Sequence, residues 1–474
     1  MIQAVVQKFL VSGGLLGRIK NMLKKWLHKV LPGKRGKTAV HKEIIPFAAH
    51  RISEDMLSFA AEKVVRRLHN EGFEAYVVGG AVRDLLLGIE PKDFDVATNA
   101  TPEEVRKIFR RSRIIGRRFQ IVHVMVGPET IEVTTFRGGG KVVQNQHGRI
   151  MKDNNYGSME EDAMRRDFTC NALYYDPIRR LIVDFHHGVA DVQAKKLVMI
   201  GNPAERYQED PVRILRAVRL SGKLGFEVEE HTAAPIPEYA GRLKQEPVSR
   251  LFDEILKLLF SGHARDCLQQ LNKLGIGSDI HPLLTAMKSA DKPENRIISL
   301  ALKNTDERLR ADKSVSTGFV LAAVLWPQLN RYWQRNISQG QRPSPALTDA
   351  INKFRDDIEK GWGVPQRFAA TMREIWQFQP QFDNTRGARP HRLLAQQRFR
   401  AAYDFLVLRA QVGEADEGLV QWWTAFQHAD NDERAKLTAS GWQGQESGQG
   451  GGQSKRKRRR KPRRKKAEGS GGEG

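Results

Sequence analysis

The chain has 474 residues, of which 40% are hydrophobic, and this length suits several packed domains rather than one. A formal net charge of +23 indicates a polyanionic partner, with nucleic acid as the first candidate. Two cysteines far apart in sequence exclude a disulfide framework and a four-cysteine zinc site, and no apolar run is long enough to span a membrane. We therefore expect a cytoplasmic setting.

The first 45 residues form a predicted basic extension. Lys and Arg occur in residues 1–42, but Asp and Glu do not. Apolar residues recur at near-helical spacing from Leu15 to Val30, with lysines between them. This pattern predicts a basic amphipathic helix that lies on RNA or peripherally on the inner membrane surface, and a frayed extension is an equal alternative.

Residues 46–195 predict an α+β catalytic head with a small mixed sheet. Ser53 is a candidate cap for a first helix that ends near Gly72. The elements expected after it are a strand at 75–78, a tight turn at Gly79-Gly80, a helix at 82–87, a strand at 94–97, a helix at 99–109 and strands at 121–126 and 130–136.

The rest of the chain is predicted to be helical up to a low-complexity tail. The helical pattern begins near residue 205 and divides into a neck at 196–265 and an RNA-binding body at 266–440. Residues 441–474 are rich in Gly, Gln, Ser and cations and predict a disordered basic tail.

The central chemical feature is the triplet Asp93-Phe94-Asp95 at a predicted strand start. Strand side chains alternate between faces, so the two carboxylates point the same way while Phe94 enters the core. Two carboxylates placed in this way can share two Mg²⁺ ions, the geometry used for in-line nucleotidyl transfer.

A glycine turn lies 13 residues upstream of Asp93. Gly79 and Gly80 allow backbone N–H groups to approach a phosphate closely, and Arg83 follows one turn into the helix. A triphosphate-binding turn is one interpretation. The alternative is an ordinary strand-to-helix turn in which Arg83 and Asp84 form a structural ion pair.

A third carboxylate would complete the metal site, and two candidates exist. Glu132 shares a strand face with Thr134, and Asp167 lies in Arg165-Arg166-Asp167-Phe168-Thr169. Asp167 also suits a helix N-cap. The sequence leaves both open.

The segment from Glu209 to Arg213 predicts a helix start with Asp210 as its cap and Pro211 at the first helical position. Both acids are spaced to pair with Arg213, which would fix its guanidinium for reading a base edge. A simple helix-start salt bridge is the alternative.

The tail contains a dense run of cations between residues 455 and 466. We expect it to bind RNA phosphates, and a solubilising tail is the alternative. The RNA-binding candidates are Lys455, Arg456, Lys457, Arg458, Arg459, Arg460, Arg463 and Arg464.

Four motifs in this order resemble those of bacterial poly(A) polymerases and tRNA CCA-adding enzymes. They are GGAVRDLLLG, KDFDVATNATPEEV, RRDFTCNALYYDP and RYQEDPVRILRAVRL. The resemblance implies a polymerase-β-like nucleotidyltransferase head, a neck with a nucleotide-selecting helix and a helical body that holds RNA.

The same resemblance assigns roles to the candidate residues. It implies that Asp93 and Asp95 are metal ligands assisted by Asp167 or Glu132, and that Gly79, Gly80 and Arg83 engage the triphosphate. It also implies that Asp210 and Arg213 hydrogen-bond the incoming base, with Arg166 near that pocket.

Features outside these motifs favour the poly(A) polymerase branch. The segment from Gly116 to Val124 and the body segment from Phe399 to Phe426 resemble the poly(A) polymerase versions. We expect a monomer that uses ATP and two Mg²⁺ ions to extend RNA 3′ ends. The alternatives are full or partial CCA addition to tRNA and, more remotely, a non-catalytic RNA-binding protein.

Overall fold

A computed structural model describes residues 42–116, 120–139, 143–144, 150–152 and 155–443. The predicted N-terminal helix and the basic tail lie outside these residues. The chain forms two compact units: residues 1–334 with 349–372, and residues 335–348 with 373–474. None of the helices in the described ranges combines the length and hydrophobicity that a bilayer span requires.

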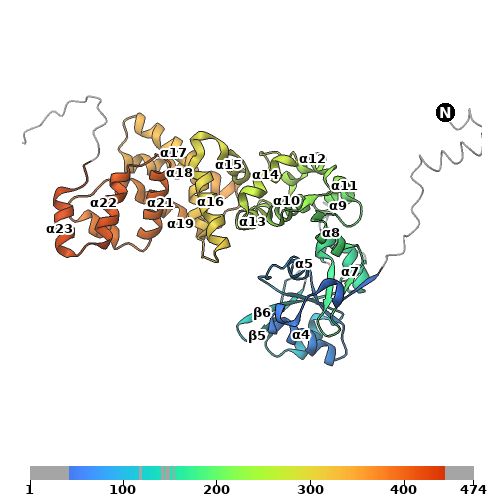
Figure 1. Cartoon of the computed structure of the whole chain (residues 1–474). Helices are drawn as coiled ribbons and strands as arrows, with labels where there is room; N and C mark the ends of the chain where they lie inside the picture. The colour runs from blue at the N-terminus through green and yellow to red at the C-terminus, as the bar shows by residue number, and fades with distance from the viewer. Residues whose placement is uncertain (1–41, 117–119, 140–142, 145–149, 153–154, 444–474) are drawn as a thin grey trace, which may run out of the picture. The chain divides into compact units, whose positions relative to one another are not determined.

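The head is built around one mixed sheet of eight strands in the order β1-β10-β9-β2-β3-β6-β5-β4 (Figure 1). Only β3 and β6 are parallel neighbours; the other pairs are antiparallel. The strands are β1 (Glu43–Pro46), β2 (Ala75–Val78), β3 (Asp95–Thr98), β4 (Ser112–Ile115), β5 (Ile121–Val126), β6 (Glu129–Thr135), β9 (Leu173–Asp176) and β10 (Leu181–Asp184). A separate two-stranded ribbon comprises β7 (Val143–Gln144) and β8 (Ile150–Lys152).

The mixed sheet was predicted, and it contains four strands that the sequence analysis did not name. These are β1, β4, β9 and β10, each of four residues. Such short runs carry too little periodicity to separate a strand from a loop. They extend the sheet on both sides of the predicted strands.

Short helices surround this sheet. They are α3 (Phe47–His50), η2 (Glu54–Met56), α4 (Phe59–Asn70), α5 (Gly80–Leu86), α6 (Pro102–Ile108), α7 (Met159–Arg165), η3 (Thr169–Asn171) and α8 (Gly188–Gln193). The predicted cap of the first helix is wrong by five residues. Ser53 precedes only η2, whereas the Ser58 hydroxyl accepts the backbone N–H groups of Ala60 and Ala61 at 3.1 and 3.2 Å. The buried stripe of α4, which includes Val64 and Leu68, packs against the sheet.

The neck follows the head and is mostly helical. Its elements are α9 (Pro203–Glu209), α10 (Val212–Leu224), α11 (Glu230–Ala233), α12 (Ile236–Tyr239), η4 (Ala240–Gln245) and α13 (Val248–Leu259). A short parallel pair, β11 (Lys196–Leu197) and β12 (Glu227–Val228), interrupts the predicted run of helices. Gly222 of α10 allows close approach of α14 (Ala264–Lys273), because a Cβ there would lie 2.7 Å from the backbone of Cys267.

The remaining helices run to residue 440. They are α14 (Ala264–Lys273), α15 (Pro282–Lys288), η5 (Ser289–Asp291), η6 (Pro293–Asn295), α16 (Arg296–Arg310), α17 (Thr317–Ser338), α18 (Pro343–Gly361), α19 (Gln366–Phe378), η7 (Gln379–Gln381), α20 (Arg389–Leu394), α21 (Phe399–Gln411), α22 (Glu417–His428) and α23 (Asn431–Ser440). The second unit has its own aromatic core, in which Phe382 and Trp423 are fully buried with ring centroids 5.2 Å apart.

Candidate active site

A cavity of about 550 Å³ collects most of the predicted site residues between the head sheet and α10. Six acidic and nine basic side chains line it, so it carries an excess of positive charge suited to a polyanionic ligand. Of the predicted head and neck residues, it includes Gly79, Gly80, Arg83, Asp95, Glu132, Arg166, Asp167, Asp210 and Arg213. Asp93 is exposed and does not line it.

The carboxylates of Asp95 and Glu132 come together through strand pairing. The two residues are register partners on the parallel strands β3 and β6. The pKa of Asp95 is raised to about 6, mainly by burial and then by the nearby charge of Glu132. Asp93 also raises this pKa, whereas the positive charge of Arg166 lowers it. Glu132 also faces β5, where His123 Nε2 lies 3.2 Å from its Oε1.

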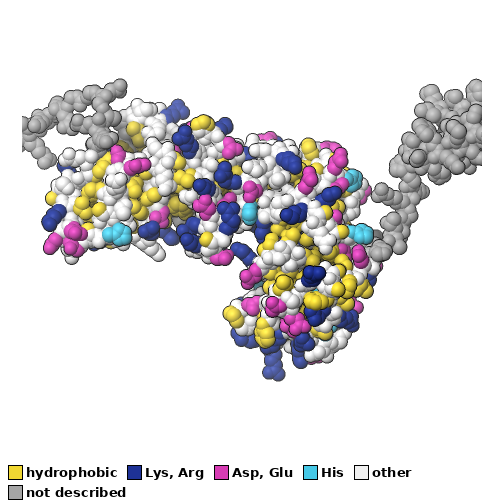
Figure 2. All heavy atoms as spheres, viewed as in Figure 1, with side chains coloured by type: hydrophobic (Ala, Val, Ile, Leu, Met, Phe, Trp, Pro, Cys, Tyr) yellow, Lys and Arg dark blue, Asp and Glu magenta, His cyan; other side chains and the backbone are white. Residues whose placement is uncertain are grey.

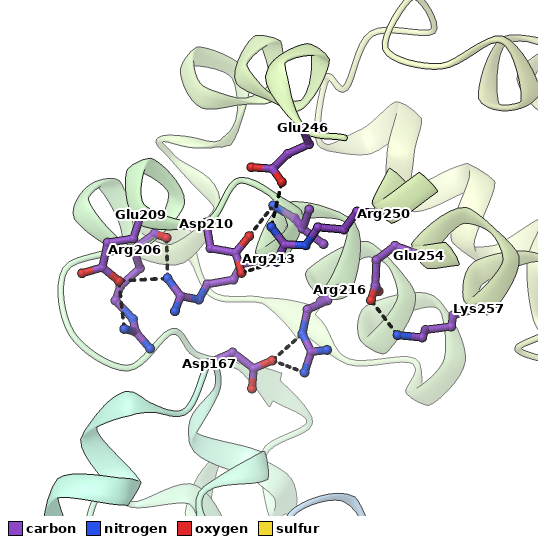
Figure 3. A network of polar contacts seen from close by, with 11 residues as sticks. Asp167, Arg206, Glu209, Asp210, Arg213, Arg216, Glu246, Arg250, Glu254 and Lys257 are labelled. Carbon is purple, nitrogen blue, oxygen red and sulfur yellow. Dashed lines mark hydrogen bonds and ion pairs between the residues drawn. The ribbon is translucent and has the colours of Figure 1, made fainter. Parts of the chain in front are cut away.

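Asp167 faces the neck and not Asp95. Its Oδ2 accepts from both Arg216 Nε at 2.7 Å and Arg216 Nη2 at 2.6 Å (Figure 3). Burial alone would raise the pKa of Asp167, but the charge and hydrogen bonds of Arg216 outweigh burial and hold this pKa below its usual value. Asp167 is also not the N-cap of η3, a position occupied by Phe168. Of the two candidates for a third carboxylate, Glu132 is therefore the one placed beside Asp95.

The glycine turn has the conformation that its sequence favours. Gly79 has φ +72° and ψ −131°, a region that residues with a Cβ rarely adopt. Gly80 begins α5, and Arg83 is buried with Nη2 2.6 Å from Asp84 Oδ1 and Nη1 2.6 Å from Asn171 Oδ1. The Arg83–Asp84 ion pair is thus present, and the same arginine lines the cavity.

Arg166 is fixed beside this turn. Its guanidinium donates to Asp162 Oδ2 at 3.2 Å, to the Tyr174 hydroxyl at 3.1 Å and to the Asn171 carbonyl at 3.1 Å. A Cβ on Gly79 would lie 3.4 Å from Arg166 Nη1. Because its position is fixed by three partners, Arg166 places a permanent positive charge close to the backbone of the turn.

The predicted cap of α10 is wrong by one residue: Pro211 is its N-cap, and Asp210 is the C-cap of α9. Asp210 and Arg213 do not pair with each other, so only one of the two predicted pairings is present. Arg213 pairs with Glu209 at 3.0 Å as expected. The Oδ2 of Asp210 instead accepts from Arg250 of α13 at 2.8 Å, while its Oδ1 accepts the backbone N–H of Val212 at 3.2 Å (Figure 3). Sequence spacing did not reveal Arg250, because it lies 40 positions away.

Three further cations of α10 line the cavity and were not predicted: Arg216, Arg219 and Lys223. Together with Arg213 they are spaced by three, three and four residues, which places them on one face of the helix. Burial lowers the pKa of both Arg219 and Lys223. The helical spacing of these cations was a signal present in the sequence.

Comparisons with known proteins agree with this arrangement. Three family models match: the poly A polymerase head domain over residues 75–198, the probable RNA and SrmB-binding site of polymerase A over 225–288, and the polymerase A arginine-rich C-terminus over 339–465. Poly(A) polymerase I of Salmonella typhi is 44% identical over 400 residues, covering 82% of this chain and 86% of that relative. Poly(A) polymerase I of Haemophilus influenzae is 40% identical over 409 residues, covering 84% and 90%.

The chain belongs to the bacterial poly(A) polymerase family. CCA-adding relatives match a shorter stretch: that of Lactobacillus helveticus is 37% identical over 223 residues, or 46% of this chain and 54% of the relative. Among solved structures, the Bacillus stearothermophilus CCA-adding enzyme in complex with CTP has a TM-score of 0.53 at 25% identity, covering 80% of this chain and 82% of that one. The predictions of a nucleotidyltransferase head and of a polynucleotide adenylyltransferase are confirmed.

The residues around Asp95 fit a magnesium ion that is completed by substrate. Among the described residues, no three His, Cys, Asp or Glu side chains gather as a ready metal site. Magnesium is, however, commonly held by one or two carboxylates together with substrate phosphates. Of the two predicted ligands, Asp95 lines the cavity and could offer such an oxygen, whereas Asp93 lies outside the cavity lining.

Metal binding should depend on pH through Asp95. Its pKa is raised to about 6, so below that pH a cation must displace a proton from the carboxyl group. We expect the Mg²⁺ affinity of the nucleotide-free protein to fall about tenfold per pH unit below about pH 6 and to level off above it. Calorimetric titration with MgCl₂ across this range measures the effect, and an affinity that does not change with pH would contradict the assignment.

The Gly79 turn should not tolerate a side chain. For Gly79→Ala we expect a loss of about 1–2 kcal/mol in the free energy of unfolding. The KM for ATP should also rise, because a residue with a Cβ is strained at this positive φ and would shift the turn that lines the cavity beside Arg166. Gly72→Ala is the matched control, since Gly72 has φ +88° but open space around its Cβ position. Urea unfolding and ATP kinetics distinguish the two: both variants should lose stability, and only Gly79→Ala should lose ATP affinity.

Proposed function

We propose that the chain transfers AMP from ATP to RNA 3′ ends without a template, releasing pyrophosphate. The observation that carries this function is the cavity in which paired carboxylates, a glycine turn and a cationic helix face converge. The reaction forms a bond between the RNA 3′-oxygen and the α-phosphorus and breaks the bond from that phosphorus to the β-phosphate. The proton of the 3′-hydroxyl is released.

The two sides of the cavity suit the two halves of this reaction. Asp95 in the cavity, together with Asp93 two residues before it and just outside the cavity lining, would hold two Mg²⁺ ions, which supply charge neutralisation at the attacking and leaving oxygens. On the other side, Arg83, Arg166 and the α10 cations offer positive charge where the triphosphate would lie. Gly79 and Gly80 allow the triphosphate to approach the backbone of the turn.

We assign selection of the base to Asp210 and Arg213. Each is held by a separate protein partner, Asp210 by Arg250 and Arg213 by Glu209, so neither side chain is free to rotate (Figure 3). A fixed acceptor and a fixed donor on one helix start can match the hydrogen-bonding edge of a single base. Glu246 holds Arg250 in turn at 2.7 Å.

Primer extension tests the function directly. The protein is given Mg²⁺ and either an unstructured RNA or a tRNA without its 3′ end, with nucleotides supplied singly and together. Long ladders from ATP alone on the unstructured RNA are expected. Addition that stops after CCA on the tRNA would instead assign the CCA-adding reaction, and binding without extension of either RNA would leave only the RNA-binding alternative.

The remaining proposals concern the ends of the chain. We propose that the cations between Lys455 and Arg464 bind RNA phosphates, which is supported by the match to the arginine-rich C-terminal model. Contact of residues 1–45 with a membrane surface and a monomeric state stay predictions. Residues 1–41 and 444–474 lie outside the described residues, whereas Glu43–Ile45, placed in the predicted extension, belong to β1 of the head sheet.

A further inference from the structure

A second hollow, of about 520 Å³, lies on the head between α4, the end of α6 and the end of β5. We call it the basic groove. Five cations line it and no acidic residue does: Lys63, Arg66, Arg67, Arg110 and Arg111. Figure 2 shows Lys and Arg side chains gathered at the end of the head where Figure 1 labels α4 and β5.

The cations of the basic groove are only partly neutralised. Arg66 and Arg67 pair with the carboxylates of Glu62 and Glu71 at 2.6 and 2.8 Å, but these pairs are exposed and weak. Within the described residues, Arg110 and Arg111 have no acidic partner. They belong to the run 105–128, which holds seven cations and no acid.

The floor of the groove is apolar and partly aromatic. Ile108, Phe109 and Met125 are half-buried beneath the cations. At one end, Lys63 lies 5.6 Å from the ring centroid of Phe59, and this ring is 71% exposed. Cations that follow an apolar, aromatic surface are the usual pattern for single-stranded nucleic acid, where phosphates meet the charges and bases stack on the rings.

The basic groove lies at the end of β5 and includes residues from both faces of that strand. Val124 and Met125, which point to opposite faces, both line it, whereas His123 faces Glu132 of the candidate active site. The two faces meet at the edge strand β4. There Arg113 is the register partner of His123 and Arg111 immediately precedes the strand, so positive charge continues around this edge.

We propose that the basic groove binds the single-stranded RNA substrate upstream of its 3′ end. This inference rests on the proposed function for the presence of an RNA strand. An anionic membrane surface is the other polyanion to consider, but Ile108, Phe109 and Met125 are half-buried, and the Phe59 ring alone is a weak anchor for a bilayer. A flexible strand can follow such a hollow and continue around the sheet edge toward the cavity.

The experiment compares Arg110→Ala/Arg111→Ala with Lys195→Ala/Lys196→Ala, which removes two exposed cations at the junction of the head and the neck. Fluorescence anisotropy measures the Kd for a single-stranded RNA of about 30 nucleotides and for one of about 6, which is near the lower end of single-strand site sizes. We expect the groove variant to bind the long RNA about tenfold more weakly and the short RNA with an unchanged Kd. The control variant should bind both RNAs with unchanged Kd. The slope of log Kd against log salt should fall by about 0.7 for each phosphate that the variant no longer neutralises.

A conservative variant and a measurement of vesicle binding complete the experiment. Arg110→Lys/Arg111→Lys keeps the charges and should restore most of the long-RNA affinity. The proposal would be overturned if the groove variant lost affinity equally for the long and the short RNA, or lost affinity for neither. Unchanged RNA binding together with lost sedimentation on phosphatidylglycerol vesicles would also overturn it. Because anisotropy needs no turnover, failure of the unaltered protein to extend RNA would reject the proposed function without deciding the groove.

Discussion

Replacing Asp95 by Asn should lower the rate of AMP incorporation by at least about three orders of magnitude while leaving the protein folded. The carboxylate is lost from the centre of the proposed metal site, and Asn is a poor ligand for Mg²⁺. Stability should not fall with activity. Burial and Glu132 raise the pKa of Asp95 to about 6, so the ionised carboxylate destabilises the folded state at neutral pH, and a neutral amide removes this cost.

The matched control for this prediction is Glu103→Gln, which neutralises an exposed carboxylate in the first turn of α6. Single-turnover extension of a labelled RNA measures activity, and a thermal melt measures stability. Activity of Asp95→Asn within tenfold of the unaltered protein would remove Asp95 from the reaction. A large fall in Tm would show that the carboxylate is structural.

Replacing Arg216 by Met should destabilise the protein by about 2–3 kcal/mol, because it leaves the Asp167 carboxylate buried and unpaired. This figure is below that for a fully buried pair, since the Arg216 side chain is 35% exposed whereas that of Asp167 is 10% exposed. Adding Asp167→Asn should recover part of the loss. Arg213→Met is the control: its partner Glu209 is 57% exposed, and the expected cost is below about 1 kcal/mol.

The same pair predicts a pH dependence. Arg216 holds the pKa of Asp167 below its usual value, so the pair stabilises the fold above the ordinary pKa of an aspartate. That contribution disappears as the pH falls through the lowered pKa. Urea unfolding should therefore show a large difference between the unaltered protein and Arg216→Met at neutral pH, and this difference should shrink steadily as the pH is lowered below the ordinary pKa of an aspartate. A difference that stays constant with pH would contradict the ion-pair explanation.

The local sequence predicted those elements of the head that have a clear hydrophobic periodicity or a clear helix N-cap. The strands at Ala75–Val78 and Ile121–Val126 agree with prediction residue for residue. The helix near 99–109 begins at Pro102 after a capping box of Thr101 and Glu104. The error at Ser53 arose because Ser58 is an equally good cap, and the chain uses the serine directly before the buried stripe.

Contacts between distant segments distinguish candidate site residues that the sequence alone left equivalent. Glu132 and Asp167 were equivalent candidates until strand pairing placed one beside Asp95 and an arginine 49 positions away bound the other. The partner of Asp210 likewise comes from another helix. Such contacts depend on the packing of segments that are distant in the chain, and local spacing carries no record of them.

The order of strands in the sheet has a consequence for synthesis on the ribosome. The edge strand β1 pairs with β10, and Ile45 meets Ile182 137 residues later in the chain. At about 5–20 residues per second, roughly 7–27 s pass between the emergence of these two partners. During that interval the nascent head lacks its final strands, so its sheet cannot be completed until β9 and β10 have left the exit tunnel.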